Sequence, residues 1–355
     1  MNETQKINEE SKSIAFAMGG LGGNNAFGAG FLQAALDKKI KPELITCTSG
    51  QIWWVYQYIK AIGQHTLPPD YLRKELENFI KSTEPFGQHD WNLLYMGLHG
   101  KPGMMRTAFP EFMLDMTKNT ISVFERVLQQ MRQGTKLFLT REVLSELPVR
   151  QLIPCFPERF FIDISDTFNQ CEIGIAFNSY DPIQGMEIVH LNDKAKQLLG
   201  KNSGDRSSYR TRTIYKDIEP EYVRQGLWVL QYGFEDSSII DGCYFRGVML
   251  SEATIAEKIF ISRPLNRKWI GKLPTSYIEN EDLKIEIFFN GSYQAEYDKI
   301  ELINTLIGQK IITHQKYHKV ELNEVEIETQ RGFFDYIFED INVFDRARTR
   351  ALLLL

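Results

Sequence analysis

The chain has 355 residues, of which 43% are hydrophobic and 25% are charged, and its formal net charge is −5. This length allows one large domain with an extension or two modest domains, and the composition is that of an ordinary folded protein. A duplex-binding domain usually carries a basic surplus, so nucleic acid is not an expected partner. Arg206, Arg210 and Arg212 lie close together; a solvated polar loop is favoured over a local basic patch there.

The cysteines and the chain start give a first indication of the compartment. None of the four cysteines belongs to a CxxC pair, so a zinc site or a thioredoxin-type motif has no support. No metal and no cofactor are expected. No secretory signal and no apolar run of the roughly 20 residues that span a bilayer is found. Residues 1–12 are polar and predict a flexible tail. We expect a reduced, cytoplasmic protein that reaches any lipid substrate as a peripheral membrane protein.

The first structured segments alternate between strand and helix. Residues 13–18 are short and apolar and predict a buried strand, and residues 26–36 carry apolar side chains at helical spacing. Residues 44–48 predict a second strand, and residues 52–62 predict a helix that Gly63 ends. This order of strand, glycine loop, helix, strand, turn and helix predicts an α/β fold with a mainly parallel sheet flanked by helices.

The rest of the chain is divided into three parts by its patterns. A helical insert is predicted at about 64–152, with an apolar stripe formed by Ile121, Phe124, Leu128 and Met131. After it, strands are predicted at 159–164, 172–177, 187–191, 226–231 and 258–262. A core domain of residues 13–271 is therefore expected to contain the insert. Residues 272–355 predict a C-terminal α+β extension, with a helix at 298–307, strands at 319–329 and a final helix.

A glycine run, Gly19, Gly20, Gly22 and Gly23, follows the first strand and precedes the first helix. Glycines in this place let backbone N–H groups face a small anion, and the helix N-terminus adds a favourable field. An oxyanion or a phosphate fits this arrangement, and so does a purely structural turn. The dinucleotide pattern GxGxxG fails at Asn25, and no Walker lysine follows. A nucleotide-binding enzyme is therefore a distant alternative.

A second signal is the sequence Cys47-Thr48-Ser49-Gly50-Gln51, between a predicted strand and a predicted helix. A serine in a sharp strand–turn–helix connection is typical of a nucleophile elbow, whose GxSxG pattern keeps small residues on both sides. A serine in this place can also be a simple helix N-cap. Gln51 is large for its position. We expect it either to widen the elbow or to point into the substrate cleft, where it would contact the head group.

A third signal is the sequence Ile239-Ile240-Asp241-Gly242-Cys243-Tyr244. The Asp-Gly pair is commonly just a turn. An aspartate at a strand end is also a common place for the catalytic base of an α/β protein. The residue pattern alone leaves both interpretations open.

Together these signals resemble the patatin-like phospholipase family, in its bacterial members with a C-terminal extension. The likeness extends over about residues 13–265 and depends on the glycine loop, the spacing to Thr48-Ser49 and the later Asp241-Gly242. The resemblance implies a lipid acyl hydrolase with a Ser–Asp dyad and no catalytic histidine. By position, Ser49 would be the nucleophile and Asp241 the base. The resemblance also assigns the oxyanion hole to the backbone of Gly20, Gly22 and Gly23.

The chain departs from the family pattern in its loop, at the elbow and after the aspartate. Asn24-Asn25 stands where the family usually has a basic residue and glycine, and Cys47, Gln51 and Cys243 stand where it has small residues. The alternative function is therefore a catalytically weak or inactive patatin-like protein that binds lipid or a protein partner. A triad with a histidine brought in by the fold is a further alternative.

An apolar stretch, residues 91–105, lies within the predicted insert. Trp91, Leu94 and Met96 are its candidates for an acyl-chain wall or a membrane-facing lid. Core packing of the insert is the other interpretation, and the two differ in how exposed these side chains are.

Overall fold

A computed structural model describes the greater part of the chain. The described residues are 12–20, 25–63, 68–84, 86, 95–96, 98–108, 125, 128–129, 132, 150–208, 210–234, 238–270, 272–314, 317–326 and 340–355. The chain divides into two compact units. The core unit comprises Met1–Asn78, Arg159–Leu227 and Ile239–Leu355, and the second unit comprises Phe79–Glu158 and Trp228–Ser238.

The core unit is built on one eight-stranded sheet in the order β10-β9-β1-β2-β5-β6-β7, with β8 paired to β5. All neighbours along this order are parallel except β5 and β6, which are antiparallel, as is the β5–β8 pair. This mostly parallel sheet, flanked by helices, is the predicted α/β class. The strands are β1 (Ile14–Met18), β2 (Leu44–Cys47), β5 (Gly174–Asp181), β6 (Met186–Leu191), β7 (Thr213–Asp217), β8 (Ile240–Asp241), β9 (Lys258–Ser262) and β10 (Glu321–Val325).

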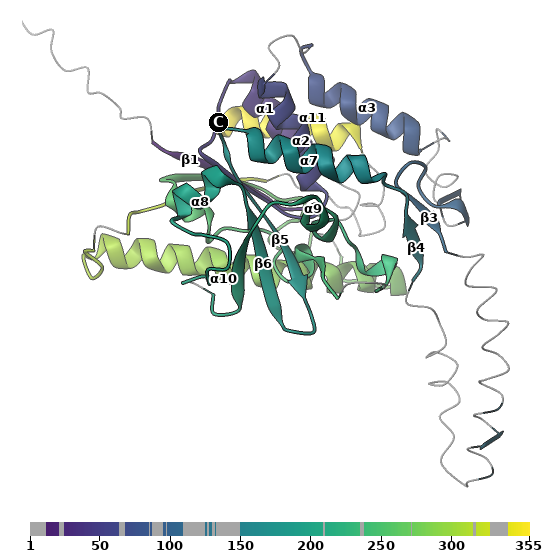
Figure 1. The fold of residues 1–355 in the computed structure, drawn as a ribbon. Helices are drawn as coiled ribbons and strands as arrows, with labels where there is room; N and C mark the ends of the chain where they lie inside the picture. The colour runs from purple at the N-terminus through teal and green to yellow at the C-terminus, as the bar shows by residue number, and fades with distance from the viewer. Residues whose placement is uncertain are drawn as a thin grey trace, which may run out of the picture. The chain divides into compact units, whose positions relative to one another are not determined.

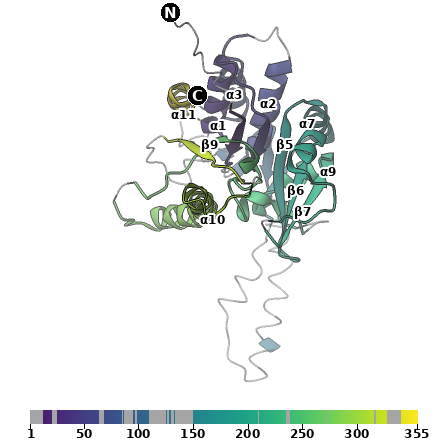
Figure 2. The ribbon, with the colours of Figure 1, turned by 90° about the vertical axis from the view of Figure 1, so that its left-hand side faces the viewer.

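Both faces of the sheet are covered, as a parallel sheet requires. Alternate residues of β1 point to opposite faces: Ala15 and Ala17 join one buried cluster, while Phe16 packs edge-on against Phe31. Figures 1 and 2 show helices α1 (Ala26–Asp37), α2 (Gln51–Gly63) and α11 (Ile341–Leu354) on one side and α10 (Tyr277–Gly308) on the other.

The strand register brings two distant segments to one place. Strand β2 pairs with the first half of β5, where Cys47 lies opposite Phe177. Strand β8 pairs with the second half of β5, where Asp241 lies opposite Ser179. β8 therefore lies just beyond the carboxyl end of β2, and the turn that follows β2 meets Asp241 there.

Two predicted strands are wrong. Residues 159–164 belong to helix α7 (Glu158–Gln170), whose buried residues recur at helical spacing: Phe161, Ile164, Ser165 and Phe168. The aromatic and β-branched residues there favoured a strand locally, but burial of one helical face outweighs that preference. Residues 226–231 contain the end of α9 (Pro220–Gly226) and part of a 3₁₀ turn (Leu230–Tyr232), which Gly233 ends at φ +74°.

The residues after Gly271, which itself lies outside the described residues, belong to the core unit. β10 adds a strand to the central sheet by pairing with β9, and α11 packs on α1, where Arg348 forms an ion pair with Asp37 at 2.7 Å. The predicted extension therefore completes the core. Helix α10 begins at a capping box of Ser276 and Glu279 and is much longer than the predicted helix.

The second unit overlaps the predicted helical insert. Helix α3 (Tyr71–Thr83) leads into it, and β3 (Met105–Thr107) pairs with β4 (Leu152–Pro154) in a small antiparallel sheet. Most of the predicted apolar stripe lies outside the described residues. In the helices that the structure describes, no segment is both long and apolar enough to cross a membrane. Helix α8 (Asp193–Leu199) completes the core unit beside β5.

Candidate active site

Ser49 occupies a tight turn between β2 and α2. Its φ is +53°, in the left-handed region that a non-glycine residue rarely adopts. The turn is closed, because the Gln51 N–H donates to the Thr48 carbonyl at 3.1 Å. A strained, closed strand–turn–helix connection is the geometry of a nucleophile elbow. Ser49 is only 4% exposed, so a group that reacts with its hydroxyl must enter the protein to reach it.

Asp241 is completely buried at the end of β8. Its Oδ1 accepts a hydrogen bond from the Cys243 N–H at 2.9 Å. Its Oδ2 has no hydrogen-bond partner of ordinary geometry in the described part of the chain. Burial raises the pKa of Asp241 to about 6, although the Cys243 N–H, the Ser49 hydroxyl and the Cys243 thiol all act to lower it. The fold thus brings Ser49 and Asp241 together.

The residue after the aspartate must be small because Asn178 lies behind it. A Cβ at Gly242 would meet the Asn178 side chain at 2.3 Å. The Asn178 amide donates to Glu187 at 2.9 Å and also reaches the carbonyl of Arg246 at 3.3 Å. Asn178 therefore fixes the turn that carries Asp241. No motif in the sequence marked Asn178, because its contacts come from strand β6 and from the segment after β8.

The glycine loop touches the elbow directly. A Cβ at Gly20 would lie 2.2 Å from the Thr48 carbonyl and 2.7 Å from the Ser49 Cβ, so only glycine fits. The Gly20 N–H donates to the Thr48 hydroxyl at 2.9 Å, and that hydroxyl donates to the Gly247 carbonyl at 2.8 Å. The predicted oxyanion role of the Gly20 N–H is therefore not supported in this conformation. Gly22 and Gly23 lie outside the described residues.

Gln51 neither widens the turn nor points into a cleft, the two outcomes expected from the sequence. Its side chain is fully buried, so the structure does not support the predicted contact with a head group. Its amide donates to the Asn25 carbonyl at 3.2 Å and lies against Gly28, where an added Cβ would fall within 2.2 Å of it. Glycine at position 28 supplies the space that glycine at position 51 would otherwise supply. The elbow therefore stays closed.

A buried ion cluster holds the segment that follows Asp241. Arg246 is completely buried, and its guanidinium contacts Glu187 at 2.7 Å, Glu252 at 2.7 Å and Glu296 at 3.1 Å. Glu296, from α10, also accepts hydrogen bonds from the N–H groups of Leu250 and Ser251, at 2.9 and 3.1 Å. The cluster ties this segment to both the sheet and α10. Glu187 and Glu296 are far from Arg246 in the sequence, so no local pattern predicted the cluster.

Two of the described histidines contact groups other than Ser49. His190 shares a hydrogen bond with Ser179 at 2.8 Å, and burial lowers the pKa of His190 to about 3. His318 contacts the Ala256 carbonyl at 3.2 Å, and His65 and His89 lie outside the described residues. The cysteines have free thiols, and the described residues contain no cluster of three or more His, Cys, Asp or Glu suited to a metal.

The predicted lid is described only in part. Trp91 and Leu94 lie outside the described residues, while Met96 is half-buried and Leu98 is 55% exposed. The lid therefore stays a prediction.

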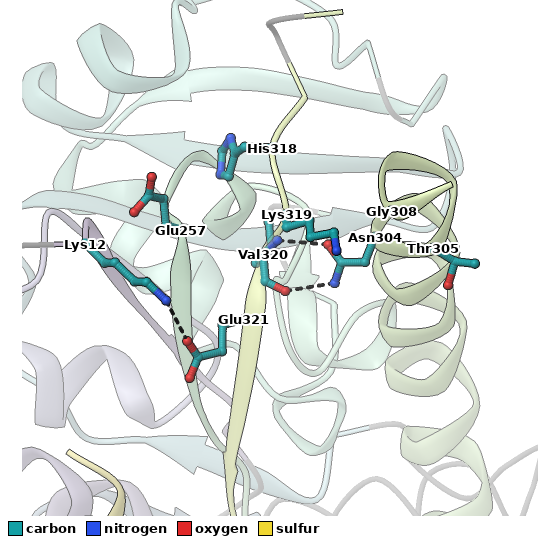
Figure 3. Close-up of a pocket in the computed structure, with 9 residues that line it drawn as sticks. All are labelled: Lys12, Glu257, Asn304, Thr305, Gly308, His318, Lys319, Val320 and Glu321. Atoms are coloured by element: carbon teal, nitrogen blue, oxygen red, sulfur yellow. Dashed lines mark hydrogen bonds and ion pairs between the residues drawn. The ribbon is translucent and has the colours of Figure 1, made fainter. Parts of the chain in front are cut away.

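A separate hollow on the core unit lies beside the start of β10 (Figure 3). Its polar groups are largely paired with one another. Lys12 pairs with Glu321 at 3.3 Å, and Asn304 bonds both the N–H and the carbonyl of Val320 at 2.8 Å. This hollow lacks the combination of elbow and buried carboxylate that marks Ser49 and Asp241.

The chain matches no protein-family model, and no curated protein matches it significantly. The class of the protein therefore follows from the fold and the geometry. It is an α/β protein with a mostly parallel sheet flanked by helices, with a strained serine turn next to a buried aspartate.

Proposed function

We propose that the protein is a serine hydrolase of acyl esters, with Ser49 as the nucleophile and Asp241 as the base. One observation carries the proposal. A fully buried carboxylate, whose Oδ2 has no hydrogen-bond partner of ordinary geometry among the described residues, lies beside a serine in a left-handed strand–helix turn. Such an arrangement costs stability, and costs of this kind concentrate at functional sites.

The reaction follows from the two side chains. Asp241 takes the proton of the Ser49 hydroxyl while Ser49 Oγ attacks the ester carbonyl carbon. The tetrahedral intermediate collapses, and the leaving alcohol takes that proton. Water then attacks the acyl-serine, Asp241 removes a proton from it, and the acid leaves with Ser49 restored. A carboxyl pKa of about 6 keeps Asp241 mostly ionised at neutral pH and makes it a better proton acceptor than an ordinary aspartate.

The developing oxyanion needs N–H donors, and losing one such donor typically costs about 2.7–4 kcal/mol of barrier. The Gly20 N–H is already bonded to Thr48. We therefore assign the donors to Gly22 and Gly23, in keeping with the resemblance to patatin-like phospholipases. The same resemblance supports a lipid acyl ester as the substrate and peripheral association with a membrane.

The test is labelling of the purified full-length protein by a fluorophosphonate probe. Ser49→Ala should abolish labelling, and Asp241→Asn should reduce it strongly. Ser165→Ala removes another buried hydroxyl in the core unit and is the matched control that should label like the wild type. Labelling that survives Ser49→Ala would place the nucleophile elsewhere, and no labelling of the wild type would remove the hydrolase proposal.

A second candidate function is a patatin-like lipid- or partner-binding protein with little activity. Two observations favour it: Ser49 is almost inaccessible, and one expected oxyanion donor is occupied. Flotation with phospholipid vesicles separates the two. Binding without turnover, equal in wild type and Ser49→Ala, is the result expected of a binder.

A further inference from the structure

A second hollow on the core unit lies between the loop after β9 and the middle of α10. Trp269, Leu283 and Ile287 give it apolar walls, and Arg267 and Lys268 lie on the loop side. A Cβ at Gly291 would have no neighbour within 4 Å, so space remains open above the helix at that residue. Ile287 is 62% exposed, although it lies on a helix whose other face is buried.

A buried carboxylate lines this hollow. The Glu286 side chain is only 6% exposed, and its Oε2 has no hydrogen-bond partner in the part of the chain that the structure describes. Burial and the neighbouring Asp282, one turn earlier on α10, raise the pKa of Glu286 to about 7, while Arg263 acts to lower it. An unpaired carboxylate in such a position is costly, and a bound donor or cation offsets that cost.

The two arginines near Glu286 have carboxylates of their own. Arg263 forms an ion pair with Glu324 at 2.6 Å, and its Nη1 donates to Asn290 at 2.5 Å. Arg267 contacts Glu324 at 2.5 Å and Glu326 at 3.4 Å. These contacts pair both guanidinium groups with carboxylates, although Arg263 Nη2 has no hydrogen-bond partner among the described residues. Lys268 lines the same hollow. The Glu286 Oε2 keeps its hydrogen-bonding capacity for a group that enters the hollow.

We infer that this hollow binds an organic ammonium group, with Glu286 as its counter-ion and Trp269 as its apolar wall. An ammonium donates a hydrogen bond to a carboxylate oxygen and is attracted to the face of an aromatic ring. Gln294 also lines the hollow; its Nε2 donates to Asp298 at 2.6 Å, and no described residue donates a hydrogen bond to its Oε1. Ser49 has no part in this binding, so the ammonium site can be tested independently of the proposed hydrolase.

Two sources supply this chemistry, a free small amine and the head group of an aminophospholipid. Calorimetric titration with ethanolamine tests the shared chemistry in the full-length protein, with inorganic phosphate as the opposite charge. Ethanolamine should bind, and phosphate alone should not. Since Glu286 must be ionised, binding should tighten about tenfold between pH 6 and pH 8, as expected for a carboxyl with a pKa near 7.

Glu286→Gln should weaken ethanolamine binding at pH 8 at least tenfold and remove its pH dependence. Glu301→Gln, an exposed change on the same helix, is the matched control and should bind like the wild type. Trp269→Ala leaves the carboxylate in place and should weaken binding several-fold. Because the pH dependence is measured on the wild type, the inference stays testable even if Glu286→Gln fails to fold.

Vesicle flotation distinguishes the two sources. Stronger binding to phosphatidylethanolamine vesicles than to phosphatidylglycerol vesicles, lost in Glu286→Gln, supports a lipid head group. Ethanolamine binding without vesicle preference supports a free amine. Absence of ethanolamine binding, binding that weakens from pH 6 to pH 8, or binding of phosphate alone would overturn the inference.

Discussion

Two buried carboxylates, on two strands that both pair with β5, have opposite surroundings. Glu187, on β6, receives hydrogen bonds from Asn178, Thr213 and Arg246 at 2.7–2.9 Å. Asp241, on β8, receives one from the Cys243 N–H, and its other oxygen has no partner of ordinary geometry among the described residues. Burial raises the pKa of both groups, but Arg246 and the other donors more than offset this at Glu187, whose pKa is lowered.

This difference is the one expected between a carboxylate that stabilises the fold and a carboxylate that accepts a proton. A carboxylate with several strong donors is held in its charged form and is a poor proton acceptor. An under-satisfied carboxylate with a raised pKa accepts a proton readily, as a general base must. The same segment, residues 241–252, contains Asp241, Arg246 and Glu252. The ion cluster fixes the backbone there, and Asp241 Oδ2, without a partner of ordinary geometry among the described residues, lies beside Ser49.

The largest effect is expected from Asp241→Asn. If Asp241 is the base, ester turnover should fall about 100- to 10,000-fold, the usual contribution of general base catalysis. The variant should unfold at the same temperature as the wild type or a higher one, because asparagine removes a buried charge. Initial rates on short-chain esters, together with thermal unfolding, measure both.

Near-normal turnover in a folded Asp241→Asn protein would move the base elsewhere. Glu187→Gln, measured beside it, should instead destabilise the fold because it disturbs the Arg246 cluster. If the two variants behaved alike, the distinction between the two carboxylates would fail.

Removing the cation of the cluster should cost stability. Arg246→Met leaves Glu187, Glu252 and Glu296 buried without their common partner, and breaking a buried ion pair costs about 3–5 kcal/mol. The free energy of unfolding in urea should fall by that order. Arg206→Met, an exposed arginine in the same unit, is the control and should change it by less than about 0.5 kcal/mol. A small loss in Arg246→Met would mean that the cluster contributes little.

The titration of Asp241 should be visible in both activity and stability. The base works when ionised, so the rate should rise with pH through about 6 and level off above it. A carboxyl whose pKa is raised in the folded state binds more protons folded than unfolded, so stability should fall as pH rises from about 3.8 to about 6. The expected loss is about 3 kcal/mol. Asp241→Asn should remove this component, and an unchanged pH profile in that variant would contradict the assignment.

The sequence predicted the first half of this arrangement well. Strand β1, helix α1, strand β2 and helix α2 lie within one or two residues of their predicted bounds, because each has a consistent apolar period and a clear end. Phe160, Phe161 and Ile162 favour a strand over a short window, which explains the wrong prediction for the start of helix α7. Its helical face becomes clear only when the window extends to Phe168.

The sequence predicted the two candidate side chains of the site but not the hydrogen bonds and ion pairs that hold them. Ser49 and Asp241 stand in recognisable local patterns, and the strand order brings them together. Thr48, Asn178 and Arg246 act through partners on other strands and on α10. Contacts of this kind depend on the order of the strands in the sheet. Local sequence patterns do not reveal that order. The partner of the Gly20 N–H was missed for the same reason.

The smallest effect concerns Gln51, whose side chain fills the space that Gly28 leaves open. Gly28→Ala should force the Gln51 amide aside and cost about 1–3 kcal/mol of unfolding free energy, as overpacking usually does. Gln51→Ala removes the obstacle, so the double variant should be more stable than the sum of the two single changes predicts, by at least about 0.5 kcal/mol. Urea unfolding of the four proteins gives this coupling.

Turnover tests the elbow itself, because the backbone bond from Gln51 to Thr48 does not depend on the side chain. Gln51→Gly should therefore change the rate on a short-chain ester by less than about threefold, well below the roughly 100-fold that a 1 Å displacement of a nucleophile can cause. A large rise in rate for Gln51→Gly would restore the view that glutamine crowds the elbow, and zero coupling would mean that Gly28 and Gln51 do not share this space.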